Sequence, residues 1–174
     1  YLWVDRYAEP ESLVAEAERH QRRLIFVPDP GIGDRLAPWF EQKHWRVDRH
    51  VVMAQLREPE READVSVVHE LSEVGLRETR RRVLSGQPWA TDEVLEQIFA
   101  AKRLIGERVR ARFFAAVVGG EVVSYADLYQ DGADAQVEDV GTLPEHRDRG
   151  YASAVVLTAI AAARGDGADF VCLV

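Results

Sequence analysis

The chain has 174 residues and a mass of 19.6 kDa, which corresponds to one domain, or to one domain with part of another. Hydrophobic residues make up 47% and charged residues 30%, so fibrous, collagenous and low-complexity classes are excluded. The net charge of −8 disfavours nucleic-acid binding, and no apolar run reaches the ~20 residues that span a bilayer. The single cysteine excludes an internal disulfide framework and fits a cytoplasmic address. Arginines outnumber the two lysines heavily, a bacterial-like composition that is typical of a GC-rich genome.

The pattern of the N-terminal part predicts the order helix, strand, helix, strand. Helical spacing of apolar residues predicts a helix over 11–21, and a compact apolar run predicts a strand over 24–27. After a run rich in Pro and Gly, Asp34 is expected to cap a second helix that continues to Lys43. Alternating apolar residues then predict a strand over 45–56.

A charged, proline-containing stretch at 58–64 has the composition of a solvated linker. We therefore expect a segment of residues 1–57 and a domain of residues 65–174. The domain begins with a predicted strand over 65–70. Two helices are expected to follow it, an arginine-rich helix around 76–84 and a helix over 91–109 with an apolar stripe.

A β-hairpin is the clearest local feature of the sequence. Residues 111–118 form an apolar run, Gly119-Gly120 can make a tight turn, and 121–129 form the returning strand. A second turn leads to a third strand over 135–143, so the three strands form a meander. An Ala-rich helix over 150–164 follows, and then a strand to residue 174, where the apolar run gives no sign of a turn. We expect C-terminal strands and a helix beyond it.

The junction between the third strand and the Ala-rich helix is expected to bind an anion. The first amides of a helix have no internal acceptor, and the helix dipole adds partial positive charge there. Gly150 lets a phosphate approach the backbone, and Arg147 and Arg149 supply positive charge in an otherwise acidic chain. The sequence therefore predicts a site that fits a diphosphate.

This junction resembles the acetyl-CoA loop of the GNAT superfamily of N-acetyltransferases, Arg/Gln-x-x-Gly-x-Gly/Ala. It stands here as Arg147-Asp-Arg-Gly150-Tyr-Ala152, after a strand end, Val140-Gly-Thr-Leu-Pro144, that is similar to the family's apolar-x-apolar-x-Pro. The resemblance covers residues 65–174. It implies an α/β (α+β) fold, a mixed and mostly antiparallel sheet flanked by helices, and acetyl-CoA as the cofactor.

The resemblance also implies positions that bind the cofactor. The exposed backbone of Val140, Gly141 and Thr142 would pair with the pantetheine arm. The backbone amides that would cradle the pyrophosphate belong to Arg147, Asp148, Arg149, Gly150, Tyr151 and Ala152, with Ser153 as a further donor.

Acetyl transfer needs a neutral amine, so a proton acceptor assists it, because a free alkylammonium has a pKa near ~10. Glu138 is our candidate general base, because members that resemble this chain often carry a carboxylate just upstream of the cofactor-binding stretch. A solvated or ion-paired carboxylate is the alternative. Strand alternation places Glu138 on one face and Asp139, the second choice, on the other. Tyr125 and Tyr129 are weak candidates for the general acid that would protonate the leaving thiolate of coenzyme A, because aromatic residues on strands usually serve packing.

Residues 1–57 resemble a degenerate half of the same fold. Phe40-Glu-Gln-Lys-His-Trp-Arg-Val47 is similar to that half's Tyr-x-x-x-Gly-Phe-x-Val, with Phe40 in place of the tyrosine and His44 in place of the glycine. A segment that lacks the tyrosine hydroxyl would have a structural role.

The leading hypothesis is an acetyl-CoA-dependent N-acetyltransferase that acts on a primary amine of a small molecule or a peptide. The alternative is a non-catalytic acyl-CoA-binding module. The five histidines show no ligand spacing, so no metal site is expected. No nucleic-acid or membrane partner is expected either. An exposed last strand would invite pairing with another chain, so a homodimer is an open possibility.

Overall fold

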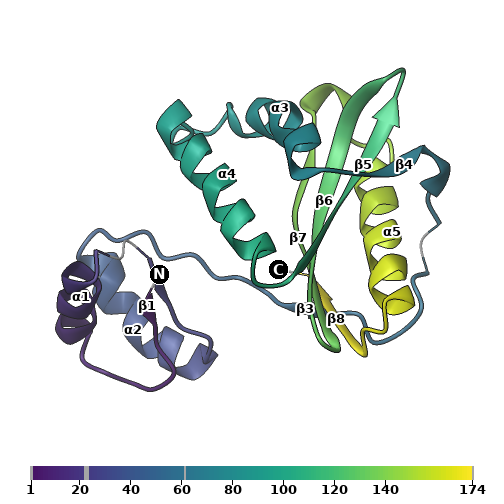
Figure 1. Ribbon diagram of the computed structural model, residues 1–174. Coiled ribbons are helices and arrows are strands. Elements are labelled where there is room, and N and C mark those ends of the chain that lie inside the picture. The colour runs from purple at the N-terminus through teal and green to yellow at the C-terminus, as the bar shows by residue number, and fades with distance from the viewer. Residues whose placement is uncertain (1, 22–23, 61, 174) are drawn as a thin grey trace. The chain divides into compact units, whose positions relative to one another are not determined.

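The computed structural model describes residues 2–21, 24–60 and 62–173 (Figure 1). The chain forms two compact units that divide between His50 and Val51. The charged stretch expected as a linker, 58–64, has no helix or strand in its described residues. Nowhere in the described chain is there a helix of the length and apolarity that crossing a membrane requires.

The N-terminal unit consists of two short parallel strands and two helices. Its elements are β1 (Leu2–Trp3), α1 (Pro10–Arg19), β2 (Ile25–Phe26) and α2 (Pro30–Gln42). Val4, Leu13, Leu36 and Phe40 form its core. The ring of Phe40 lies 5.2 Å from that of Trp45, edge to face, so the aromatic residues of this segment serve packing.

Two expectations for this part of the chain are wrong. The second helix begins at Pro30 and is capped by Asp29, whose side chain accepts the amide of Ile32 at 2.9 Å, and not by Asp34. Proline is tolerated there because an amide in the first helical turn has no partner in the helix. The strand expected over 45–56 is reduced to β3 (Met53–Ala54), since only those residues pair with another strand.

The second unit is built on a six-stranded sheet in the order β3, β8, β7, β6, β5, β4. Strands β7 and β8 are parallel and the other neighbours are antiparallel, which confirms the expected mostly antiparallel sheet. A 3₁₀ turn occupies 65–67, so the first strand starts later than expected. The strands are β4 (Val68–Leu71), β5 (Arg110–Val118), β6 (Glu121–Asp131), β7 (Asp134–Thr142) and β8 (Phe170–Leu173).

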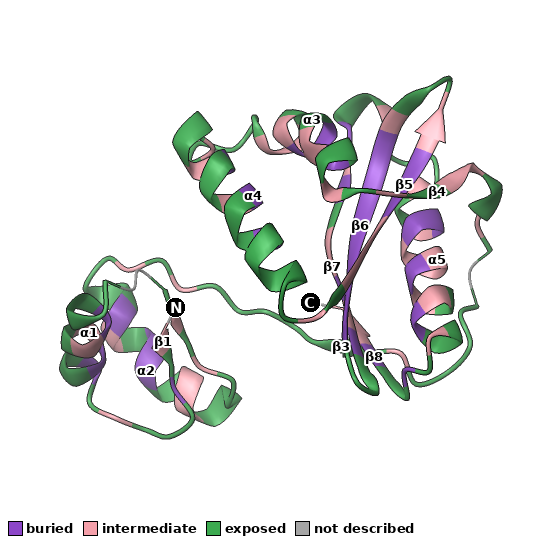
Figure 2. Ribbon diagram, viewed as in Figure 1, coloured by how far each residue is buried: buried purple, intermediate pink, exposed green. Residues whose placement is uncertain are grey.

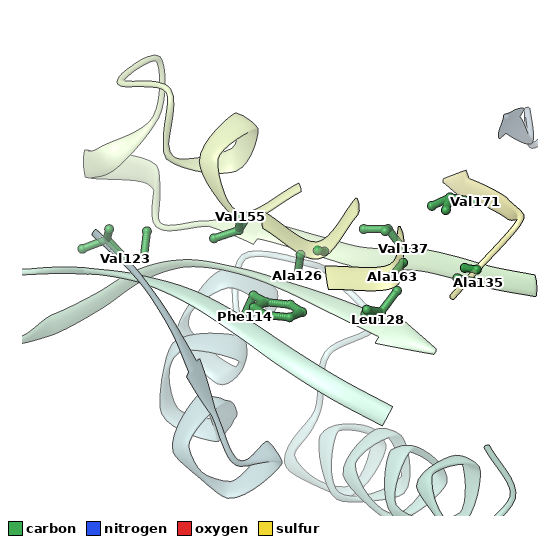
Figure 3. Close-up of a cluster of buried hydrophobic side chains, with 12 residues drawn as sticks. Phe114, Val123, Ala126, Leu128, Ala135, Val137, Val155, Ala163 and Val171 are labelled. Carbon is green, nitrogen blue, oxygen red and sulfur yellow. The ribbon is translucent and has the colours of Figure 1, made fainter. Parts of the chain in front are cut away.

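Helices cover both faces of this sheet (Figure 1). The helix α5 (Tyr151–Gly165) lies on one face, and α3 (Glu73–Leu84) and α4 (Asp92–Gly106) lie on the other. The main core is between α5 and the strands, where side chains such as Phe114, Val137 and Val155 are buried (Figure 3). Each helix buries one side and exposes the other (Figure 2). The predicted hairpin is confirmed, with Gly119 and Gly120 at its turn.

A β-bulge interrupts β7. Tyr125 of β6 pairs with Gly141 and Asp127 pairs with Glu138, so β7 has one residue more than β6 between these pairs. Asp139 takes up the extra length with a φ of 55°. At Gly141 a Cβ atom would lie 2.4 Å from Cζ of Tyr125, so the buried tyrosine ring requires glycine there.

We expect Gly141→Ala to lower the free energy of unfolding by at least about 2 kcal/mol, because the Tyr125 ring has no room to move in the packed core. Gly165→Ala is the matched control, since no atom lies within 4 Å of the Cβ that it adds. Urea unfolding of both variants measures the difference. Equal stability of the two would contradict the close packing of Tyr125 on Gly141.

Candidate active site

The loop between β7 and α5 leaves the start of α5 open to an external anion. Side chains of Asp29, Ser72 and Thr91 cap α2, α3 and α4, whereas Gly150 at the start of α5 offers no side-chain cap. Gly150 has a φ of 84°, a conformation that favours glycine. The backbone amide of Ala154 donates a hydrogen bond to the carbonyl oxygen of Gly150 at 3.0 Å. The backbone amides that precede Ala154 in the first turn have no acceptor within the helix.

Free positive charge and open space accompany this helix start. Arg147 and Arg149 are exposed, and neither forms an ion pair with any residue that the structure describes. A hollow of about 380 Å³ adjoins the loop, lined by residues 62–64 on one side and by Arg149, Gly150, Tyr151 and Ser153 on the other. These features fit the pyrophosphate of a nucleotide-bearing cofactor.

Strand β7 is parallel to β8 from Asp134, opposite Phe170, to Val137, opposite Leu173. Leu173 is the last residue of β8 that the structure describes. Glu138 is the next residue of β7 after this pairing, and Val140 is 38% exposed. Strand β7 continues to Thr142, shortly before the loop that leads to α5.

Glu138 follows the last described pair between β7 and β8 and is half-buried. The side-chain amide of Gln136 donates a hydrogen bond to its Oε2 at 2.6 Å. Burial raises the pKa of the Glu138 carboxyl above its ordinary value, and the nearby charges of Asp139 and Asp127 raise it further. The charge of Lys102 and the hydrogen bond from Gln136 lower the pKa of Glu138 and offset part of this rise. A carboxylate with a raised pKa is suited to accept a proton near neutral pH.

Asp139 is not where strand alternation placed it. Its carboxylate contacts Arg80 and Lys102, which come from α3 and α4, so it faces the side of the sheet that these helices cover. Alternation fails because the bulge turns the backbone at Asp139. The expectation that Asp139 lies on the face opposite to Glu138 is therefore wrong, and Asp139 is held in ion pairs.

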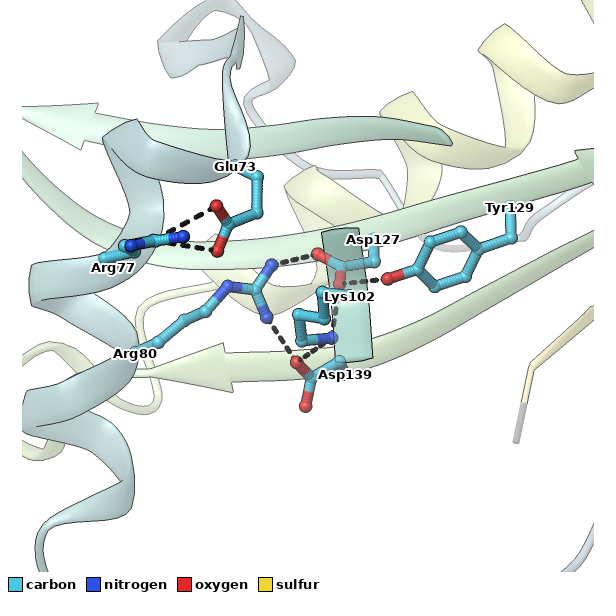
Figure 4. A network of polar contacts seen from close by, with 7 residues as sticks. All are labelled: Glu73, Arg77, Arg80, Lys102, Asp127, Tyr129 and Asp139. Atoms are coloured by element: carbon cyan, nitrogen blue, oxygen red, sulfur yellow. Dashed lines mark hydrogen bonds and ion pairs between the residues drawn. The ribbon is translucent and has the colours of Figure 1, made fainter. Parts of the chain in front are cut away.

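A buried ionic network surrounds the bulge, and the sequence did not reveal it (Figure 4). Arg80 is fully buried and bridges Asp127 of β6 and Asp139 of β7. The Lys102 Nζ atom lies 2.7 Å from an oxygen of each of the same two aspartates. Burial opposes the charge of Arg80, but the two aspartates outweigh it and raise the arginine's pKa.

The two tyrosines that were weak candidates for the acid are both packed. Tyr125 is 1% exposed, and the Arg80 guanidinium lies 4.5 Å from its ring centre. The Tyr129 hydroxyl donates to Asp127 Oδ2 at 3.0 Å. Burial raises the pKa of both phenols, with Asp139 adding to the effect at Tyr125 and Asp127 at Tyr129. Within the described residues, no group of His, Cys, Asp and Glu side chains is arranged to hold a metal ion.

A family model described as the acetyltransferase (GNAT) family matches residues 75–174, which is more than half of the chain. The chain therefore belongs to the GNAT acetyltransferase family, and residues 75–174 form its acyltransferase domain. The match does not include the N-terminal unit, so the resemblance of residues 1–57 to a half-domain stays a prediction. A comparison with curated protein sequences gives no match.

Of three solved structures that match this chain, the first two below have TM-scores above 0.5 and show the same fold. A putative acetyltransferase from Agrobacterium tumefaciens is 23% identical with a TM-score of 0.51, over 62% of this chain and 79% of that one. A putative acetyl transferase from Pyrococcus furiosus is 16% identical with a TM-score of 0.51, over 62% and 81%. A GNAT family acetyltransferase from Brucella melitensis, solved in complex with acetyl-CoA, is 14% identical with a TM-score of 0.48, over 61% and 74%.

We expect Arg80→Ala to lower the free energy of unfolding by about 3–5 kcal/mol, because Asp127 and Asp139 would lose one of the two cations that compensate them. The matched control is Arg77→Ala, one turn earlier on α3 (Figure 4). Its partly exposed pair with Glu73 is worth about 1 kcal/mol or less. Thermal and urea unfolding of both variants check this, and similar losses would contradict a central role for Arg80.

Proposed function

We propose that the chain is an N-acetyltransferase that moves the acetyl group of acetyl-CoA to a primary amine by direct attack in a ternary complex. The observation that carries this proposal is the position of Glu138. A half-buried carboxylate with a raised pKa lies on β7, the strand that leads to the uncapped start of α5.

The proposed cofactor contacts follow the path of β7. The backbone of Val140, Gly141 and Thr142 would pair with the pantetheine arm along β7. The amides of the loop and of the first turn of α5, from Arg147 to Ala152, would bind the pyrophosphate, with the Ser153 hydroxyl as a further donor. The acetyl group arrives activated as a thioester.

The chain's own groups would then serve the transfer. Glu138 takes a proton from the acceptor ammonium, directly or through water, so that the neutral amine can attack the thioester carbonyl. The Val140 amide donates a hydrogen bond to the carbonyl oxygen, which becomes negative as the new C–N bond forms. The C–S bond then breaks. The nitrogen loses its second proton, which passes to the sulfur of the leaving thiolate, so that coenzyme A is released as the thiol. A thiol with a pKa of about 8.5 is a good leaving group as the thiolate, so the transfer depends little on a separate general acid.

The acceptor is proposed as a cationic primary amine. The protein carries a net charge of −8, which favours the approach of positively charged molecules. The non-catalytic alternative, an acyl-CoA-binding module, would bind coenzyme A without releasing thiol from acetyl-CoA with any amine. Isothermal titration with coenzyme A and a thiol-release assay over a panel of amines separate the two functions.

We expect Gly150→Leu to weaken coenzyme A binding at least about tenfold, because the side chain strains the φ of 84° and fills the space before the first amides of α5. Gly132→Leu is the matched control. Gly132 also has a positive φ, 58°, but lies in the turn at the other end of β7. Isothermal titration with coenzyme A measures both. Unchanged affinity in the Gly150 variant would contradict the proposed pyrophosphate site.

We expect Glu138→Gln to reduce kcat by about 10²–10⁴ and to remove the ascending limb of the pH profile of kcat/KM, while coenzyme A affinity stays the same. Asp134→Asn, at the other end of the same strand, is the control and should keep wild-type activity. The thiol-release assay with the most active amine of the panel measures both variants. An ascending limb that survives in Glu138→Gln would contradict the assignment of this base.

A further inference from the structure

We propose that Lys102 is a positioning residue for the acetyl transfer: it fixes the two carboxylates that flank Glu138, and its charge compensates the Glu138 carboxylate. This inference rests on the proposed function of Glu138 as the base. Lys102 lies on α4, distant in sequence from the cofactor loop and from the strand that carries Glu138. No feature of the loop motif points to it.

The geometry ties Lys102 to both neighbours of Glu138. Asp139 is the next residue along β7, and Asp127 is the residue directly opposite Glu138 on β6. The Lys102 Nζ atom lies 2.7 Å from Oδ2 of Asp127 and 2.7 Å from Oδ2 of Asp139, and the side chain is only 8% exposed (Figure 4). The single ammonium therefore holds α4 against the bulge from which Glu138 projects.

Removal of Lys102 would leave the charges around Glu138 further from balance. With Lys102, two cations face three carboxylates and the group carries one net negative charge when Glu138 is ionised; without Lys102 it would carry two. The charged and titratable groups around the bulge are Lys102 from α4, Arg80 from α3, Asp127 and Tyr129 from β6, and Asp139 from β7. Both cations pair with the two aspartates, and the charge of Lys102 also lowers the pKa of Glu138.

A purely structural role would predict something different. If Lys102 only fastened α4 to the sheet, its removal would lower stability and leave the ionisation of Glu138 where it is. If Lys102 compensates Glu138, its removal makes the carboxylate harder to ionise, and removal of a neighbouring negative charge reverses that effect. The two roles can therefore be separated by a titration.

The test follows the Glu138 side-chain carboxyl by ¹³C NMR against pH in the full chain without ligands, with Glu138→Gln to assign the signal. In Lys102→Met we expect the midpoint of the Glu138 titration to move to higher pH. In the double variant Lys102→Met/Asp139→Asn we expect this midpoint to return toward the wild-type value. Lys102→Arg keeps the charge and should keep the midpoint. Asp139→Asn alone should move the midpoint of the Glu138 titration to lower pH. Lys102→Gln also removes the charge and keeps a donor for one aspartate, so it provides the test if Lys102→Met does not fold.

Kinetics then separate this inference from the proposed function. The ascending limb of kcat/KM, measured by thiol release with the most active amine of the panel, should follow the NMR midpoint in every variant. If the midpoint stays in place in Lys102→Met, or in Lys102→Gln where Lys102→Met does not fold, the role of Lys102 is overturned and Glu138 remains the base. If the midpoint moves but the ascending limb stays in place, the assignment of Glu138 as the base is overturned. The role of Lys102 in the transfer is then overturned as well.

Discussion

The compensation of two buried aspartates by two cations is the constraint on which the site depends. Asp127 is fully buried in the sheet, and a charge in such a place is tolerated only when it is paired. Arg80 and Lys102 supply the pairing from α3 and α4. Because both cations also contact Asp139, the same interactions fix the bulge of β7 and the point where Glu138 emerges.

The chain is acidic overall, whereas the proposed cofactor is an anion. In the proposed site, backbone amides would provide the attraction that the net charge does not. The −8 charge repels a pyrophosphate on average, so the attraction must be local. In the proposed site, an uncapped helix start would supply that attraction together with Arg147 and Arg149, which pair with no acidic residue in the described part of the chain. Strand β7 joins this anion site to Glu138, so the two halves of the proposed chemistry are held by one rigid element.

Local patterns predicted the hairpin, the meander and α5, because each depends on periodicity and turn residues that are close in sequence. The face of Asp139 could not be predicted in this way. The bulge arises from the pairing of Tyr125 with Gly141 across two strands, and the sequence of β7 alone does not show it. The buried cations did leave a signal: Lys102 continues the buried stripe of Leu95 and Phe99 on α4, and Arg80 follows Leu76 by one helical turn on α3.

A charged residue on an apolar stripe usually costs stability, so its presence there needs a compensating benefit. Here the benefit is that the two cations pair with the two aspartates, while Glu138 forms no ion pair with any residue that the structure describes and feels the charge of Lys102 only at a distance. Under the proposed mechanism an acceptor ammonium would bring the missing positive charge into the site. After the transfer the amide product is neutral and the proton remains on Glu138, so the local charge is again balanced when the product leaves.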